Sequence, residues 1–302
     1  MSRIHEALKQ AEHDRAVSQS DSRVDGSMLD VTANPETVIA SASALAGAAP
    51  AMGLTLHGVL SNVRQTKWSP DPRTMLFFNP EDHAPGMEEF RTLRSRLYQI
   101  REKQPLSKLL VTSALPKEGK SFTSANLAQV IARQHGKRAL LIDADLRNPQ
   151  LHTLLGAESG PGLSEYLHSE SDEFSIIQRG PTENLFLIPA GRETANSAEL
   201  VGNGRMKFLL NRLEPIFDWI IIDSPPTVLV SDTGLLANYC DGVLLVVRSN
   251  NTPIDAARRA KNDFGDRPVV GVVLNGIAHD LAPYSQYYYS SYGAEAKPAA
   301  KN

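Results

Sequence analysis

Cysteine is almost absent from this chain of 302 residues, in which Cys240 is the single thiol. A lone cysteine excludes an internal disulfide, and it offers none of the spacings by which cysteines bind a metal. Long apolar runs are missing too, because no stretch reaches the roughly 20 apolar residues that a membrane-spanning helix needs. We therefore expect a buried structural thiol at Cys240 and a chain without a membrane span.

An excess of charge of one sign is also lacking, because 31 lysines and arginines face 34 aspartates and glutamates, for a net charge of −3. This balance excludes strongly basic nucleic-acid binders and acidic tail proteins, so no nucleic-acid partner is expected. The opening sequence MSRIHEALKQAEHDRA has no apolar core and does not resemble a signal peptide. The simplest expectation is a cytoplasmic globular protein.

The most informative stretch runs from Ser107 to Asp145. An apolar run, Leu109 to Val111, leads into ALPKEGKS at 114–121, and a helical pattern then continues to Gly136. A buried strand, a loop with Gly-Lys-Ser and a helix in this order predict a phosphate-binding loop. The start of such a helix presents free backbone N–H groups and a positive dipole end to an anion.

Each residue type in the loop suits this chemistry. Gly119 lets the backbone approach a phosphate, Lys120 carries a charge for the β and γ phosphates, and Ser121 offers a hydroxyl for Mg²⁺. One departure is Ala114, which stands where the motif begins with glycine. A chance Gly-Lys-Ser at a helix start is the alternative, but it does not explain the aspartates that end the next strand. The predicted nucleotide contacts in the loop are Pro116, Lys117, Glu118, Gly119, Lys120, Ser121 and Phe122.

Apolar runs and helical patterns alternate through the rest of the chain. Nearly continuous apolar strands separated by helices predict an α/β fold, with a mostly parallel sheet covered by helices on both faces, as in P-loop NTPases. A nucleotide would then bind at the carboxyl ends of the strands. The expected strands lie near 108–113, 138–143, 184–189, 218–223, 242–248 and 269–275. The expected helices lie near 88–100, 121–135, 163–168, 197–213, 231–239 and 253–264.

Carboxylates at strand ends complete the predicted site. Asp223 is expected to hold Mg²⁺ through water or with Ser121, and a helix-capping role is less suited because the next helix starts later. Asp143 and Asp145 alternate along a strand end, so one can bind Mg²⁺ while the other accepts a proton. Asp143 is the first candidate for either task and Asp145 the second, and both join Lys120 as predicted catalytic residues.

Two further polar residues are predicted nucleotide contacts. Arg147 is close to these aspartates in sequence and can steady a phosphate, with a structural ion pair as the alternative. Asn275 lies just past the last expected strand and can read the base, with a plain turn residue as the alternative.

The two ends of the chain differ in composition from its centre. The amphipathic pattern of residues 1–15 predicts a helix that docks on a partner, with a frayed terminus as the alternative. The C-terminal tail has little basic charge, which argues against RNA binding. Its tyrosines suggest phosphoryl acceptors, each phosphate adding about −1.5 to −2 charges, with a sticky aromatic tail as the alternative. They are Tyr284, Tyr287, Tyr288, Tyr289 and Tyr292. The expected divisions are a short amphipathic helix at 1–15, a mostly disordered linker at 16–78, a nucleotide-binding domain at 79–280 and a flexible tail at 281–302. The end of the linker is expected to pack on the domain through Trp68, Phe77 and Phe78.

These motifs resemble those of the bacterial tyrosine kinases of the polysaccharide co-polymerase system, in their cytoplasmic autokinase form. ALPKEGKS looks like the Walker A loop of the family, ALLIDADLRNP at 139–149 like its A′ motif, and WIIIDSPP at 219–226 like its Walker B motif. Leu115 favours these kinases over partition ATPases of the ParA and MinD group, which carry a lysine at that loop position. The family tolerates substitution at the position of Ala114.

The resemblance implies an enzyme that uses ATP and Mg²⁺ to phosphorylate its own tail tyrosines in trans within a homo-oligomer, which can be a ring. Glu88, Arg91 and Arg94 are similar to the family's subunit-contact motif, although their spacing alone would indicate a solvated helix face. The implied partners are a transmembrane polysaccharide co-polymerase, which would hold the chain at the inner membrane and activate it, and an antagonistic tyrosine phosphatase. The implied role is in exopolysaccharide or capsule polymerisation and export. An ATPase switch of the ParA and MinD type, or an ATP-binding scaffold without kinase activity, remains the alternative.

Overall fold

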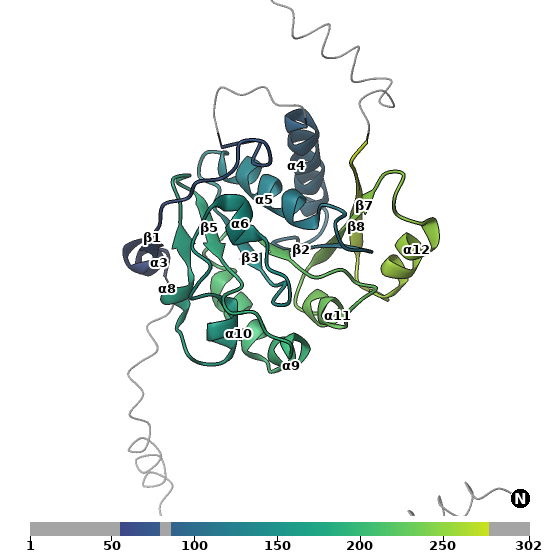
Figure 1. Ribbon diagram of the computed structural model, residues 1–302. Helices are drawn as coiled ribbons and strands as arrows, with labels where there is room; N and C mark the ends of the chain where they lie inside the picture. Colours follow the sequence, from purple (N-terminus) through teal and green to yellow (C-terminus); the bar gives the residue numbers. More distant parts are fainter. Residues whose placement is uncertain (1–54, 79–85, 278–302) are drawn as a thin grey trace, which may run out of the picture. The chain divides into compact units, whose positions relative to one another are not determined.

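The computed structural model describes residues 55–78 and 86–277 of the chain, and its elements carry the labels of Figure 1. These residues form one eight-stranded sheet in the order β1-β4-β5-β3-β6-β2-β7-β8. All neighbouring strands are parallel except β4 and β5, so the expected mostly parallel α/β sheet is confirmed. The strands are β1 (Arg64–Gln65), β2 (Lys108–Ser113), β3 (Ala139–Asp143), β4 (Gln178–Arg179), β5 (Leu185–Ile188), β6 (Trp219–Asp223), β7 (Gly242–Arg248) and β8 (Val269–Asn275).

Helices cover both faces of this sheet. Figure 1 shows α4, α5 and α6 on one side and α9, α10 and α11 on the other, with α12 beside the edge formed by β7 and β8. The helices are α3 (Leu56–Asn62), α4 (Met87–Arg101), α5 (Lys120–Ala132), α6 (Leu151–Leu155), α7 (Leu163–Leu167), α8 (Glu173–Ile176), α9 (Ser197–Gly202), α10 (Arg205–Leu213), α11 (Asp232–Ala237) and α12 (Ile254–Asn262). Within the described residues, no helix is long and apolar enough to cross a membrane.

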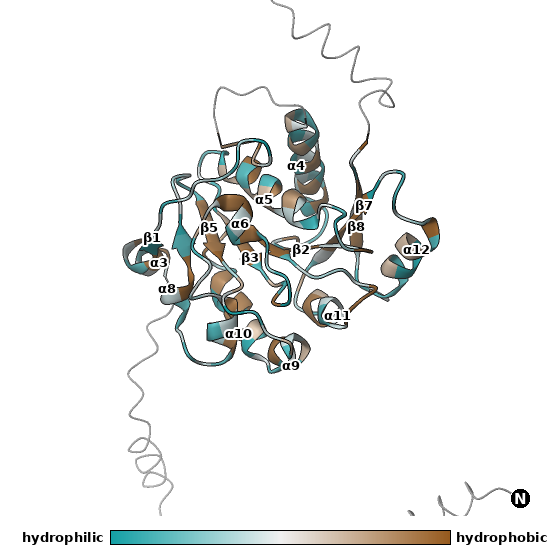
Figure 2. Ribbon diagram, in the orientation of Figure 1, coloured by the Kyte–Doolittle hydropathy of each residue, from teal (hydrophilic) through white to brown (hydrophobic). Residues whose placement is uncertain are grey.

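The central strands are buried on both of their faces. Along β3, Leu140 and Ile142 join the hydrophobic cluster beside α9 and α10, whereas Leu141 joins the cluster beside α4 and α5. Because successive strand residues point to opposite faces, an unbroken apolar run serves both layers. Figure 2 shows the hydrophobic colour concentrated on these strands. Each fully buried side chain of this size contributes about 1.5–3 kcal/mol to folding.

The structure differs from the expectation of a mostly disordered linker over 16–78. Residues 55–78 contain α3 and β1, and β1 pairs with β4. Trp68, Met75 and Phe77 are buried in the cluster that contains α4 and α5, and Phe78 packs against it, which confirms the packing expected at the end of this segment. The sequence shows little periodicity here because α3 has 7 residues and β1 has 2, which is too short for a pattern to emerge.

The helix expected over 197–213 is two helices. α9 ends at Gly202, and Gly204, in the left-handed conformation with a φ of 85°, is the residue from which α10 begins. The expected helix at 1–15, the linker at 16–54 and the tyrosine-rich tail at 281–302 all lie outside the described residues.

Candidate functional site

The loop between β2 and α5 has a left-handed backbone conformation that requires glycine at position 119. Gly119 precedes the first residue of α5 with a φ of 96°, and Lys117 also lies in the left-handed region with a φ of 64°. A Cβ atom added to Gly119 would lie 2.0 Å from Nδ2 of Asn275. Glycine is therefore required at the position before α5, where the first N–H groups of the helix are free to bind an anion.

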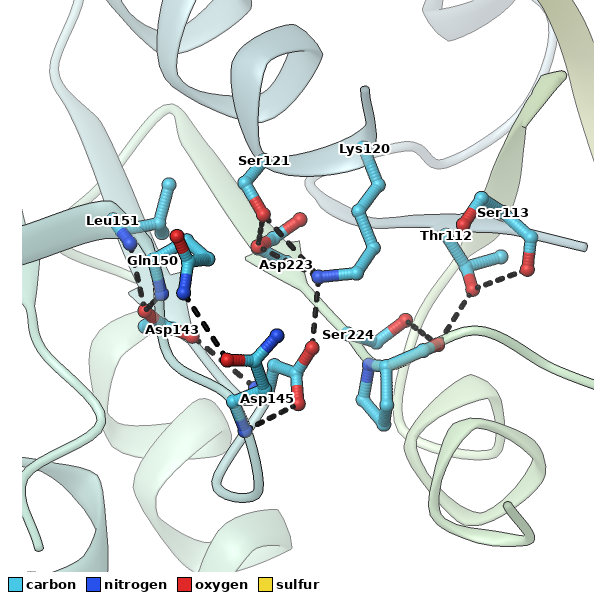
Figure 3. Close-up of polar contacts among 12 residues, drawn as sticks. Thr112, Ser113, Lys120, Ser121, Asp143, Asp145, Gln150, Leu151, Asp223 and Ser224 are labelled. Carbon is cyan, nitrogen blue, oxygen red and sulfur yellow. Dashed lines mark hydrogen bonds and ion pairs between the residues drawn. The ribbon is translucent and has the colours of Figure 1, made fainter. Parts of the chain in front are cut away.

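Lys120 lies among the carboxylates at the ends of the neighbouring strands. Its Nζ is 2.8 Å from Oδ2 of Asp145 and 3.6 Å from Oδ2 of Asp223, and it reaches the hydroxyl of Ser121 at 3.2 Å (Figure 3). Burial by itself lowers the pKa of Lys120, but the charges of Asp223 and Asp145 outweigh it and hold the pKa above its usual value. The ammonium group therefore stays charged at physiological pH.

Ser121 and Asp223 offer oxygen ligands of the kind that Mg²⁺ prefers. The Ser121 hydroxyl donates to Oδ2 of Asp223 at 2.6 Å, and the Ser124 hydroxyl donates to Oδ1 at 3.0 Å. Burial raises the pKa of Asp223, although Lys120 and the two hydroxyls favour its charged form. Among the described residues, no cluster of three acidic, histidine or cysteine groups would hold a metal by itself. The donor set thus fits Mg²⁺ bound by one or two protein oxygens, with phosphate and water completing the shell.

Asp143 is turned toward the start of α6. Its oxygens accept hydrogen bonds from the backbone N–H groups of Asp145 at 3.2 Å, Gln150 at 3.1 Å and Leu151 at 3.0 Å (Figure 3). Burial, together with the nearby charge of Asp223, raises the pKa of Asp143 to about 8. The two aspartates of this segment therefore face different partners, since Asp145 contacts Lys120 and Asp143 holds the backbone that follows β3.

Arg147 forms the ion pair that the sequence left open as an alternative. Its Nε lies 3.2 Å from Oδ2 of Asp232, a buried carboxylate that also accepts a hydrogen bond from the Ser197 hydroxyl. Sequence reasoning did not single out Asp232, because it belongs to a helix distant in the chain. The Ser124 hydroxyl was missed as well, although its position one helical turn after Lys120 is a signal that can be read.

The loop residues predicted as nucleotide contacts have different environments. Pro116 and Lys117 are exposed, whereas Glu118 is buried. The Phe122 ring packs edge-on against Phe90 of α4 at 5.8 Å, so its side chain belongs to the core of that face. Asn275 donates from Nδ2 to the carbonyl oxygen of Glu118 at 2.9 Å, which places it directly on the loop.

The charged residues in the row on α4 contact different partners. Glu88 and Arg91 form an exposed ion pair with each other. Arg94 instead donates from Nη1 to the carbonyl oxygen of Val130 at 2.9 Å and so packs onto α5. The three residues lie on one side of the helix, where Glu88 is exposed and Arg91 and Arg94 are both half-buried.

Comparisons with known proteins converge on this arrangement. A family model described as an AAA domain matches residues 118–256. The tyrosine-protein kinase YwqD of Bacillus subtilis is 36% identical over 211 residues, which cover 69% of this chain and 88% of YwqD. The tyrosine-protein kinase Wzc of Salmonella typhimurium is 32% identical over 216 residues, which cover 71% of this chain but 30% of that protein.

Solved structures show the same likeness. The kinase domain of the Escherichia coli tyrosine kinase ETK matches with a TM-score of 0.62 and 29% identity, covering 76% of this chain and 84% of that chain. The chimerical protein CapA2B2 matches with a TM-score of 0.63 and 28% identity, covering 73% of this chain and 98% of that chain.

Proposed function

The chain belongs to the bacterial tyrosine-protein kinases, and on that premise we propose that it transfers a phosphoryl group from ATP to tyrosines of its own C-terminal segment. The observation that carries the proposal is the buried cation of Lys120 at the start of α5, between the carboxylates of Asp145 and Asp223. This arrangement presents one positive charge and a free helix N-terminus to the phosphates of a nucleotide.

The loop and Lys120 hold the phosphates in this proposal. The N–H groups of 116–121 bind the phosphate oxygens, and Lys120 exchanges part of its contact with Asp145 for the β and γ phosphates. Asn275 and Arg147 complete the nucleotide contacts, Asn275 while bonded to the loop at Glu118 and Arg147 while it stays paired with Asp232. Catalysis then depends mainly on positioning and on neutralising charge.

Ser121 and Asp223 are the proposed Mg²⁺ ligands, with Asp143 as the further carboxylate at the same strand ends. Asp143 and Asp223 are register partners on adjacent strands, which supports a shared role. When bound, Mg²⁺ neutralises charge on the phosphates and orients them. The protein's part is to hold the Ser121 hydroxyl and the Asp223 carboxylate side by side, joined by a hydrogen bond of 2.6 Å, where both would be available to the ion.

Asp143 and Asp145 are the proposed proton acceptors for the tyrosine hydroxyl. A phenol has a pKa of about 10, so transfer benefits from a carboxylate placed beside it. Burial raises the pKa of Asp143 to about 8, so at neutral pH most of this carboxyl already carries a proton, and three backbone N–H groups occupy its oxygens. Asp145 keeps one oxygen directed at Lys120. The rates of tyrosine phosphorylation by Asp143→Asn and Asp145→Asn, compared with the wild type, show which of the two carboxylates accepts the proton.

The proposed acceptors are Tyr284, Tyr287, Tyr288, Tyr289 and Tyr292, reached in trans within a homo-oligomer. The exposed pair of Glu88 and Arg91 is available for a contact between copies, with Arg94 supporting the helix from behind. Phosphates on the tail add about −1.5 to −2 charges each and would loosen a ring by repulsion. A tyrosine phosphatase would reverse the change.

A transmembrane polysaccharide co-polymerase is the proposed activator, recruiting the chain to the inner face of the membrane for exopolysaccharide or capsule synthesis. The support is the likeness to kinases such as Wzc, of which this chain spans 30%. Deletion of residues 1–54, which leaves every described residue in place, tests whether the opening segment serves that recruitment. Unchanged membrane association of the deleted chain would count against it.

Mass spectrometry of the C-terminal peptide before and after addition of ATP and Mg²⁺ tests the activity. We expect phosphate on the tail tyrosines of the wild type and of Lys261→Met, an exposed lysine on α12 used as the matched control. We expect none on Lys120→Met. Phosphate on a purified Lys120→Met sample would reject the site. A wild-type tail that stays clean, even with a partner's cytoplasmic segment present, would reject the autokinase and favour an ATPase switch.

A further inference from the structure

Glu118 places a negative charge inside a loop proposed to bind phosphates. A carboxylate that faced the phosphates would repel them, because like charges at short range are costly where water is excluded. The structure shows the carboxylate turned back and buried, with 3% of the residue exposed. Its Oε2 accepts the N–H of Leu115 at 2.8 Å, and its Oε1 accepts the hydroxyl of Thr252.

Thr252 is held in place by the strand that precedes it. It lies in the turn between β7 and α12, and its Oγ1 accepts the N–H of Arg248 at 2.8 Å. The Thr252 hydroxyl therefore has one acceptor role and one donor role, and the donor is committed to Glu118. This hydroxyl joins the loop to the turn that precedes α12.

The ends of β7 and β8 reach the loop at two more points. Arg248 donates from Nη1 to the carbonyl oxygen of Lys117 at 3.1 Å, and Asn275 donates to the carbonyl oxygen of Glu118. Lys117 needs such support, since a non-glycine residue with a φ of 64° is disfavoured in isolation. Side chains from one edge of the sheet thus fix consecutive loop residues in the shape that precedes Gly119.

We infer that Thr252 is a positioning residue for nucleotide binding. Its hydroxyl keeps the Glu118 carboxylate away from the phosphate site and holds the loop ready before a ligand arrives. This role rests on the proposed nucleotide site but not on the proposed tyrosine acceptors. The sequence predicted Glu118 as a nucleotide contact, but in this inference its side chain shapes the loop and does not touch the nucleotide.

Removal of the hydroxyl has a specific consequence. In Thr252→Val, Oε1 of Glu118 loses its donor, and a buried carboxylate oxygen without a partner is unfavourable. The carboxylate then turns to solvent or to the Lys120 ammonium, and in the second case it competes with phosphate. We expect ADP to bind about tenfold more weakly and KM for ATP to rise by a similar factor, with kcat within about twofold.

Calorimetric titration of the full chain with ADP and Mg²⁺ tests the role without any turnover. Thr252→Ser keeps the hydroxyl and is expected to bind as the wild type does. Thr182→Val, at a threonine in the loop before β5, is the matched control for the loss of a hydroxyl. Wild-type affinity in Thr252→Val, or a Thr252→Ser variant as weak as Thr252→Val, would overturn the inference.

A double variant separates the charge of Glu118 from general damage. When Glu118→Gln is added to Thr252→Val, the displaced group carries no charge, so affinity for ADP should recover most of the loss. No recovery would overturn the claim that the hydroxyl restrains a repulsive carboxylate. Circular dichroism and thermal melting confirm that each variant is folded.

The outcome is separable from that of the kinase proposal. A wild type that binds ADP, a tenfold loss in Thr252→Val and a tail without phosphate would reject the tyrosine acceptors while retaining Thr252. Phosphorylation of the tail together with unchanged ADP affinity in Thr252→Val would do the reverse. A wild type that binds no ADP would overturn both.

Discussion

The carboxylate of Asp143 accepts the backbone N–H of Leu151 at 3.0 Å and so caps a helix eight residues further along the chain. The residue before that helix, Gln150, makes no side-chain capping bond, and its N–H also donates to Asp143. A residue whose position at a strand end predicts catalysis therefore also holds the turn between β3 and α6. Substitution of Asp143 will change stability as well as activity.

At about pH 6, where its raised pKa leaves Asp143 uncharged, Asp143→Asn should lower the free energy of unfolding by about 2 kcal/mol, because the new NH₂ group cannot accept an N–H as the carboxyl oxygen does. Urea denaturation of the nucleotide-free protein measures the change. The matched control is Asp255→Asn, at an exposed aspartate of α12, which should stay within about 0.5 kcal/mol of the wild type. Equal stability of Asp143→Asn and the wild type would contradict the capping role.

Lys120→Met should also destabilise the nucleotide-free protein, by about 3 kcal/mol, because it leaves Asp145 and Asp223 buried without their cation. Addition of Asp145→Asn removes one of the two unpaired charges and should restore part of the loss. Thermal melting of the single and double variants forms a double-mutant cycle. Purely additive effects would show that Lys120 and Asp145 are not coupled.

Gly119→Ala should abolish nucleotide binding while the rest of the fold persists. The new methyl group would lie 2.0 Å from Nδ2 of Asn275, and alanine disfavours a φ of 96°. Asn275→Ala alone removes a contact to the loop and should weaken ADP binding only in part. Adding it to Gly119→Ala relieves the collision but not the backbone strain, so binding should stay weak. Full recovery in the double variant would show that the collision alone matters.

The lowered pKa of Asp241 leads to a prediction of how the free energy of unfolding depends on pH. Burial raises its pKa, but hydrogen bonds from the N–H groups of Lys108 and Ser107 and from the Ser107 hydroxyl, with the Lys108 charge, hold it below its usual value. A carboxyl whose pKa is lowered on folding stabilises the fold above its unfolded pKa of about 3.9, and the contribution disappears as pH falls through the folded pKa.

The wild type should therefore exceed Asp241→Asn in stability by a constant margin above about pH 5, and the margin should shrink below about pH 4. Urea denaturation at a series of pH values gives both curves. A margin that does not change across this range would mean that Asp241 does not ionise differently on folding.

The elements that the sequence predicts well are those with strong local signals. β3 and β6 are apolar along their whole length and end in aspartates, so their position and the meeting of Asp143 and Asp223 at one edge follow from pattern alone. The loop before α5 follows from its glycine and lysine in the same way. In each case the information lies within a few neighbouring residues.

The features that the sequence does not predict depend on contacts between distant segments. Thr252 and Glu118 are 134 positions apart, and Arg147 and Asp232 are 85 apart, so no local pattern joins them. β1 and β4 have two residues each, and both depend on partners distant in sequence, since β1 pairs with β4 and β4 also pairs with β5. The direction of the Asp143 side chain is likewise decided by the N–H groups of a later turn.

The segment before α4 sets a limit on how far this protein can be shortened. Asn126, in the middle of α5, accepts the N–H of Leu76 at 2.8 Å and donates to the carbonyl oxygen of Thr74 at 2.9 Å. A gene fragment that encodes only α4 onward would thus lose two restraints on the helix that carries Lys120 and leave open the surface that Met75 and Phe77 cover. Weak nucleotide binding by such a fragment would come from the loss of packing around α5, since the residues of the nucleotide site would all still be present.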